Sequence, residues 1–132
     1  MESTRKHLRV LIIDDDDGTR ESFRAILDYW GYDVWLAATG PEAISIASDY
    51  HPSVVFLDLG IRGSNVYEVI RSLNRLPLKP FITVVSGFGA DEDRKRSADA
   101  GADLHLVKPA DLDGIKKLLE SLSRALVPCV PA

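Results

Sequence analysis

The chain is poor in the features that mark secreted, membrane-bound and nucleic-acid-binding proteins. Its 132 residues include one cysteine, Cys129, so no disulfide can form within the chain, which fits a reducing compartment. The start is polar, and no apolar run approaches the roughly 18 residues of a membrane helix. We therefore expect a cytoplasmic protein without signal peptide or membrane span. A net charge of −4 with no basic stripe argues against nucleic acid as a partner.

The composition is that of one ordinary globular domain. Apolar residues make up 45% of the sequence and charged residues 27%, and a chain of 132 residues can bury one core but not two. No internal repeat or low-complexity segment interrupts it. We expect a domain over residues 7–126 with short tails at 1–6 and 127–132. Because so little follows the last predicted helix, we expect this domain to be free-standing.

Strand and helix patterns alternate five times along the chain. Continuous apolar runs rich in β-branched residues predict strands buried on both faces. These runs cover about 8–13, 33–37, 53–58, 81–86 and 103–107. Apolar residues at helical spacing lie between them, as at Phe23, Ile26, Leu27 and Trp30. The alternation predicts an α/β fold of the (βα)5 type, with a parallel sheet, helices on both faces and right-handed crossovers.

Local signals predict where several helices begin and end. Thr39-Gly40-Pro41-Glu42 is a capping box that opens the second helix, and Asp111 is a predicted cap for the last one. Gly31 and Gly101 lie where a helix needs a residue with positive φ in order to end. The helix predicted between residues 90 and 100 has only alanines to bury. It is either a plain exposed helix or an element that moves when a neighbouring site changes.

Carboxylates end two of the predicted strands. The run at 10–13 leads into Asp14-Asp15-Asp16-Asp17, and the run at 54–57 leads into Asp58. The carboxyl ends of parallel strands meet at one edge of a sheet, where ligands bind. Carboxylates gathered there repel each other, and a hard divalent cation relieves this repulsion. Because Mg2+ favours one or two carboxylates together with water and phosphate oxygens, the sequence predicts Mg2+ beside a phosphorylated group.

Two further polar residues, Ser86 and Lys108, end the fourth and fifth predicted strands. Asp58 could act as a nucleophile and form an acyl phosphate, while Mg2+ held by Asp15 and Asp58 would neutralise the phosphoryl oxygens. The Lys108 ammonium could pair with one phosphoryl oxygen and the Ser86 hydroxyl could donate to another. Each residue alone has a plainer interpretation as a cap, a strand end or a surface lysine. Their coincidence at consecutive strand ends favours phosphoryl chemistry.

The combined motifs resemble the receiver domain of two-component response regulators. The matching segments are Ile13-Asp14-Asp15, Asp58, Ser86-Gly87 and Lys108-Pro109, and the resemblance covers about residues 7–126. It implies a flavodoxin-like three-layer sandwich whose parallel five-stranded sheet has the order 2-1-3-4-5. The single-domain chemotaxis regulators are the group that the chain resembles in its organisation.

The resemblance also implies roles for the residues at the sheet edge. Asp58 would accept a phosphoryl group from a phosphohistidine on a sensor histidine kinase or a histidine phosphotransfer protein. Asp15 and Asp58 would ligate Mg2+ directly, Asp14 mainly through a bound water, and Gly60 through its backbone carbonyl. Lys108 matches the lysine that pairs with the phosphoryl group.

Two other positions correspond to the switch of the family. Ser86 matches the switch Ser/Thr, and His105 stands where receivers often place a rotating Tyr or Phe. A half-buried polar residue on an edge strand is the plainer interpretation of His105, and a pH-sensitive switch residue is the alternative. The loop after Asp58 departs from the family pattern, since Arg62 and Val66 replace the common proline and glycine.

These matches imply a signalling domain and not an enzyme, apart from self-phosphorylation from phosphodonors and self-dephosphorylation. Phosphorylation would shift the population between two packings and so change the surface that a downstream protein contacts. Alternatively, the domain would pass the phosphoryl group on in a phosphorelay. The resemblance also allows a phosphorylation-dependent homodimer through the fourth and fifth helices. Neither nucleic acid nor membrane is expected as a partner.

A rival interpretation is an enzyme. Residues 15–19, Asp-Asp-Asp-Gly-Thr, also resemble the opening motif of haloacid-dehalogenase-like phosphatases, which would use Asp15 as nucleophile, Asp17 as acid/base and Mg2+ as cofactor. However, the acidic residues after Lys108 do not form the paired motif that completes the metal site of that class, and Asp58 would have no role. A third interpretation, a binding module of the same fold without phosphorylation, is disfavoured by the complete set of acceptor, metal and phosphate-pairing residues.

Overall fold

Five parallel strands form one sheet in the order β2-β1-β3-β4-β5. The computed structural model describes residues 8–87, 91–108 and 111–126. The strands are β1 (Arg9–Ile13), β2 (Asp33–Ala37), β3 (Val54–Asp58), β4 (Phe81–Ser86) and β5 (Leu104–Val107). All five predicted strands are confirmed, as is the predicted strand order.

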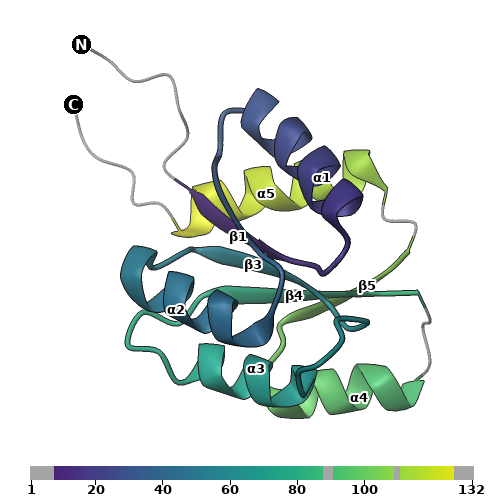
Figure 1. The fold of residues 1–132 in the computed structure, drawn as a ribbon. Coiled ribbons are helices and arrows are strands. Elements are labelled where there is room, and N and C mark those ends of the chain that lie inside the picture. The colour runs from purple at the N-terminus through teal and green to yellow at the C-terminus, as the bar shows by residue number, and fades with distance from the viewer. Residues whose placement is uncertain (1–7, 88–90, 109–110, 127–132) are drawn as a thin grey trace.

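Helices in the described residues cover both faces of this sheet (Figure 1). They are α1 (Asp17–Tyr29), α2 (Gly40–Tyr50), α3 (Val66–Asn74), α4 (Asp91–Ala100) and α5 (Leu112–Leu126). Helices α1 and α5 lie on one face, and α2, α3 and α4 lie on the other (Figure 1). This is the predicted flavodoxin-like three-layer sandwich. Among the described helices, none has both the length and the apolar character that crossing a bilayer requires.

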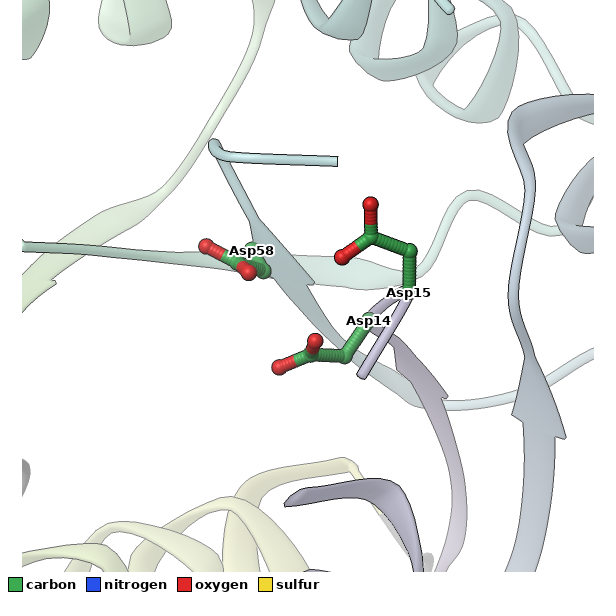
Figure 2. A group of neighbouring side chains, drawn as sticks. All are labelled: Asp14, Asp15 and Asp58. Atoms are coloured by element: carbon green, nitrogen blue, oxygen red, sulfur yellow. The ribbon is translucent and has the colours of Figure 1, made fainter. Parts of the chain in front are cut away.

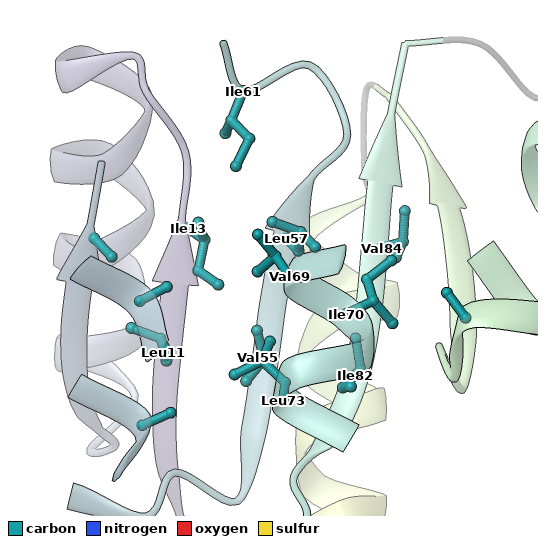
Figure 3. Close-up of a cluster of buried hydrophobic side chains, with 14 residues drawn as sticks. Leu11, Ile13, Val55, Leu57, Ile61, Val69, Ile70, Leu73, Ile82 and Val84 are labelled. Carbon is teal, nitrogen blue, oxygen red and sulfur yellow. The ribbon is translucent and has the colours of Figure 1, made fainter. Parts of the chain in front are cut away.

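The structure has two clusters of buried apolar residues, one on each face of the sheet, where the chain length had predicted a single core, and alternate residues of each central strand enter them. Leu11, Ile13, Val55 and Leu57 pack against α2 and α3, as Figure 3 shows, whereas the residues between them face α1 and α5. The central strands are apolar at consecutive positions because both of their faces are covered by helices. The same alternation decides on which face a residue at the end of a strand presents its side chain.

The predicted helix-end signals are present in the structure. The Thr39 side chain accepts a hydrogen bond from the Glu42 amide, and the Glu42 carboxylate reaches back to the Ala38 amide. Gly31 and Gly101 have φ values of 94° and 119°, as a residue ending a helix in the left-handed region requires. Asp111 directly precedes α5, and its carboxylate accepts a hydrogen bond from the Asp113 amide at 3.3 Å. The two residues before it, Pro109 and Ala110, lie outside the described residues.

Helix α4 buries few side chains and almost no apolar surface. Its buried side chains among those described are Ser97 and Ala100. The Arg96 guanidinium lies 4.3 Å from the centroid of the Tyr67 ring on α3, so a cation–π contact adds to this small buried area. The prediction of an exposed helix is confirmed. Because little apolar surface holds it, we expect local opening of α4 to cost little free energy.

We expect Gly101→Ala to destabilise the fold. A Cβ at this position would lie 2.7 Å from Asn74 Cγ, and the φ of 119° strains any L residue. The free energy of unfolding should fall by about 1–3 kcal/mol, as measured by urea denaturation. Gly114→Ala in α5 is the matched control: its Cβ would meet nothing closer than 3.6 Å, so stability should hold or rise by up to about 1 kcal/mol. Equal urea midpoints for the two variants would contradict this prediction.

Candidate functional site

Strand register brings Asp14 and Asp58 together at the carboxyl edge of the sheet. Ile13 lies beside Leu57 in the pairing of β1 with β3, so Asp14 follows as the neighbour of Asp58. The Asp14 amide donates to the Ala37 carbonyl at 3.1 Å, which ties the residue after β1 to β2. Both acidic residues continue the alternation that faces α1 and α5. As a result, Asp14 is only 5% exposed.

Three carboxylates converge at this edge (Figure 2). One oxygen from each of Asp14, Asp15 and Asp58 lies within 4.8 Å of the others. A cluster of acidic side chains suits a hard cation that prefers oxygen ligands, and Mg2+ is such a cation. The donor set therefore fits the predicted metal. An Asp15 oxygen and an Asp58 oxygen lie within 4.8 Å of each other, so both carboxylates belong to one cluster, as a shared ion requires.

Asp58 is held between a backbone donor and a cation. Its Oδ1 accepts from the Gly60 amide at 3.0 Å, and its Oδ2 lies 3.4 Å from Lys108 Nζ. The Lys108 amide donates to the Ser86 carbonyl at 2.7 Å, which continues the pairing of β4 and β5 to the edge of the site. The structure thus brings Lys108 to the carboxylate with which it was predicted to act. Pro109, the next residue of that motif, lies outside the described residues.

Asp15 has a partner that the sequence analysis did not predict. The backbone amide and the Nε of Arg62 both donate to Asp15 Oδ2, each at 3.1 Å. These hydrogen bonds hold the pKa of Asp15 below its ordinary value. Arg62 had been noted only as a replacement for the common proline. Its charge, four residues after Asp58 at the same sheet edge, was the one available signal.

The acidic run is divided between the site and the start of α1. Asp16 is the N-cap of α1, and its Oδ2 accepts from the Thr19 hydroxyl and the Thr19 amide, which lowers the pKa of Asp16. Asp17 forms an ion pair with Arg20 on the surface of the first turn. Burial raises the pKa of Asp14, although the Asp16 amide opposes this shift by donating to Asp14 Oδ1. Asp14 and Asp15 thus belong to the site, while Asp16 and Asp17 belong to the helix.

Ser86 and His105 are joined by a hydrogen bond. Ser86 Oγ lies 2.8 Å from His105 Nε2, and Ser86 is only 5% exposed at the end of β4. His105 is half-buried on the edge strand β5, as its plainer interpretation predicted. The contact with Ser86 was not predicted, because it depends on the register that sets Val84 beside His105. It links the two predicted switch positions directly.

A groove of ≈ 780 Å³ opens beside the carboxylates. Its polar end is formed by Asp14, Asp58 and Lys108. Its apolar walls come from α1, the sheet and α5, and include Phe23, Ile26, Phe56, Leu112 and Ile115. The groove therefore leads to Asp58 from the side of α1 and α5.

Comparison with known proteins defines the class of this chain. The family described as the response regulator receiver domain matches residues 10–120, so the chain belongs to this family. The cell cycle response regulator CtrA of Brucella ovis is 30% identical over 117 residues, which cover 89% of this chain and 50% of that protein. The chain thus spans about half the length of the curated relatives it matches.

Solved structures agree with the fold. A CheY-like response regulator receiver domain protein from Methanospirillum hungatei JF-1 has a TM-score of 0.81 and 28% identity, over 89% of this chain and 95% of that one. A two-component response regulator from Clostridium difficile has a TM-score of 0.86 over 92% of this chain and all of its own, and at 19% identity it supports the fold alone. The receiver interpretation is confirmed. The haloacid-dehalogenase-like alternative finds no support, since Asp17, its predicted acid/base, pairs with Arg20.

We expect Asp14→Asn to stabilise the metal-free protein at neutral pH. Because burial raises the pKa of Asp14 above its ordinary value, the folded state binds this proton more tightly than the unfolded chain does. Stability therefore falls as the pH rises through the raised pKa, and the ionised carboxylate carries that cost at neutral pH. Asparagine removes the charge and can still accept from the Asp16 amide.

Urea denaturation in the presence of a chelator measures this effect. The midpoint of Asp14→Asn should exceed that of the wild type at neutral pH, and the gain should shrink as the pH falls toward 3.8. Asp49→Asn, on the exposed surface of α2, is the control for loss of one negative charge. A gain that is independent of pH, or equal in both variants, would count against the burial of Asp14 as its cause.

Proposed function

We propose that this receiver domain accepts a phosphoryl group on Asp58 with the help of Mg2+. The observation that carries the proposal is the convergence of three carboxylates within 4.8 Å, with Lys108 Nζ 3.4 Å from Asp58 Oδ2. Asp15 and Asp58 are the proposed direct ligands of the metal, and Asp14 acts mainly through water. Gly60 supplies its backbone carbonyl, and the hydrogen bond of its amide to Asp58 supports this assignment by keeping Gly60 close.

The proposed reaction moves one phosphoryl group between two side chains. An Asp58 oxygen forms a bond to phosphorus while the P–N bond of the donor phosphohistidine breaks, and the imidazole nitrogen keeps the electron pair and takes up a proton. When bound, Mg2+ neutralises the charge on the phosphoryl oxygens and aligns them. Lys108 pairs with one phosphoryl oxygen, and the Ser86 hydroxyl donates to another. Attack by water on phosphorus later releases phosphate and restores the Asp58 carboxylate.

The signal leaves the site through Ser86. The Ser86 hydroxyl has one proton, so when it donates to the phosphoryl group it can no longer donate to His105 Nε2, and the contact between the two side chains changes. The weakly packed helix α4 connects β4 to β5 and responds with them. The result is a shift of population toward a second packing with a different surface.

The partners in this proposal are proteins. The donor is a sensor histidine kinase or a histidine phosphotransfer protein, whose phosphohistidine approaches along the groove between α1 and α5. The phosphorylated domain then binds a downstream protein or passes the phosphoryl group on in a phosphorelay. A cytoplasmic location, domain bounds at 7–126 and a phosphorylation-dependent homodimer stay predictions. Nucleic acid and membrane are not among the proposed partners.

Treatment with acetyl phosphate and Mg2+ tests the acceptor. Intact-mass measurement should detect one added phosphoryl group, because a small phosphodonor needs no docking surface. Asp58→Asn should abolish the gain, and Asp49→Asn, which removes the same charge from the surface of α2, should retain it. A phosphoryl group that persists in Asp58→Asn, or that maps to another residue in the wild type, would contradict the assignment of Asp58.

Beryllofluoride with Mg2+ tests the switch. We expect the ring nitrogen resonances of His105 to change in 15N NMR spectra, because Ser86 exchanges its hydrogen bond for one to the phosphoryl mimic. Ser86→Ala should produce a similar change without beryllofluoride, and His51, at the end of α2, is the internal control whose signals should hold. If the His105 signals stay unchanged while the mimic binds, the proposed exchange at Ser86 is wrong.

A further inference from the structure

Arg62 occupies a carboxylate that the metal needs. Two donors of this residue, the backbone amide and Nε, share Asp15 Oδ2 at 3.1 Å each. Asp15 is at the same time one of the three residues whose oxygens converge within 4.8 Å. A metal ion at this cluster and the guanidinium of Arg62 are therefore two cations that draw on the same carboxylate.

The two donors of Arg62 differ in how firmly they are held. The preceding residue, Ile61, is 5% exposed and packs into the core on the α2 and α3 side of the sheet, and the Gly60 amide is fixed to Asp58 Oδ1. The loop backbone is thereby anchored, and the Arg62 amide with it. The Arg62 side chain is 89% exposed, so its guanidinium can leave Asp15 without unpacking anything. Of the two donors, the guanidinium is therefore the one that a metal ion can displace from Asp15, while the backbone amide stays in place.

The second cation of the site does not compete in the same way. Lys108 Nζ lies against Asp58 Oδ2, and its side chain is 40% exposed. In the proposed function Lys108 stays in place, because it pairs with the incoming phosphoryl group. Arg62 has no such role in the proposed function. Its partner is Asp15, whose proposed role is to bind the metal and nothing else.

We propose that the Arg62 guanidinium is a built-in competitor for divalent metal at Asp15, so that it sets the Mg2+ concentration at which the site loads. This inference rests on the proposed metal-binding role of Asp14, Asp15 and Asp58. Exposed ion pairs alter equilibria modestly, by roughly 1.4-fold to fivefold, so Arg62 tunes metal loading and does not block it. Arg62 is a positioning residue in this sense, because it acts through Asp15.

Titration of the full chain with MgCl2, without phosphodonor, tests the competition by 15N NMR. Arg62→Gln should lower the dissociation constant for Mg2+ by roughly two- to fivefold, since the exposed pair is lost. Arg62→Lys, which keeps the charge, should fall between Gln and the wild type. Arg75→Gln, which removes an exposed positive charge next to α3, should leave the constant unchanged. In the wild type, the Arg62 Nε–H resonance should shift with the same midpoint as the Gly60 amide.

Two results would overturn the proposal: an Arg62→Gln dissociation constant equal to or weaker than that of the wild type, or an Nε–H resonance that stays fixed while the metal binds. Asp15→Asn and Asp58→Asn separate this failure from a failure of the proposed function. If both variants lose Mg2+ while Arg62→Gln binds like the wild type, only the competition is wrong. If both bind Mg2+ normally, or the wild type binds none, the metal site itself is wrong and the inference falls with it.

Discussion

Mutual repulsion among three carboxylates is the constraint on which the rest of this structure depends. The register of β1 against β3 forces Asp14 and Asp58 to be neighbours, and Asp15 brings a third charge within 4.8 Å. Each carboxylate has a different stabilising partner. Asp58 pairs with the Lys108 ammonium, Asp15 pairs with the Arg62 guanidinium, and the buried Asp14 accepts a hydrogen bond from the Asp16 amide. The hydrogen bond from the Asp16 amide does not offset the loss of hydration at Asp14, so burial raises the pKa of this carboxyl group. The fold tolerates this cost because it is local to the sheet edge and both cores are apolar.

A hydrogen bond between Ser86 and His105 connects the carboxylate edge to the edge strand β5. Ser86 ends β4 beside the carboxylates and contacts His105 on β5, the edge strand. Between these strands runs α4, which buries little beyond Ser97 and Ala100. In the proposed switch, a change at Ser86 would therefore reach α4 and β5, where little is buried, more readily than the apolar residues on either side of β1 and β3.

The sequence carries the fold and the location of the site because both depend on local patterns. Burial on two faces makes the strands continuously apolar, and their carboxyl ends must share one edge, so Asp14, Asp58 and Lys108 could be predicted to meet. The Arg62–Asp15 and Ser86–His105 contacts could not be predicted in this way. The first depends on the path of a loop that is anchored by Ile61 and lacks the usual proline, and the second on the register of β4 with β5. Such contacts arise from tertiary geometry, for which residue spacing gives no rule.

The roles proposed for Lys108 and Arg62 differ, and the difference follows from how exposed their side chains are. A cation that is to remain through phosphoryl transfer gains from partial burial, because its attraction to the phosphoryl oxygens is screened less there than in water. A cation that a metal ion is to displace must be well solvated. If the ion pair were buried, the departure of the cation would leave a carboxylate buried without a partner, which is costly. Lys108 is 40% exposed and Arg62 is 89% exposed, in the order that these requirements demand. If the exposures of Lys108 and Arg62 were exchanged, the cation that competes with the metal would be hard to displace, and the cation that pairs with the phosphoryl group would be held weakly.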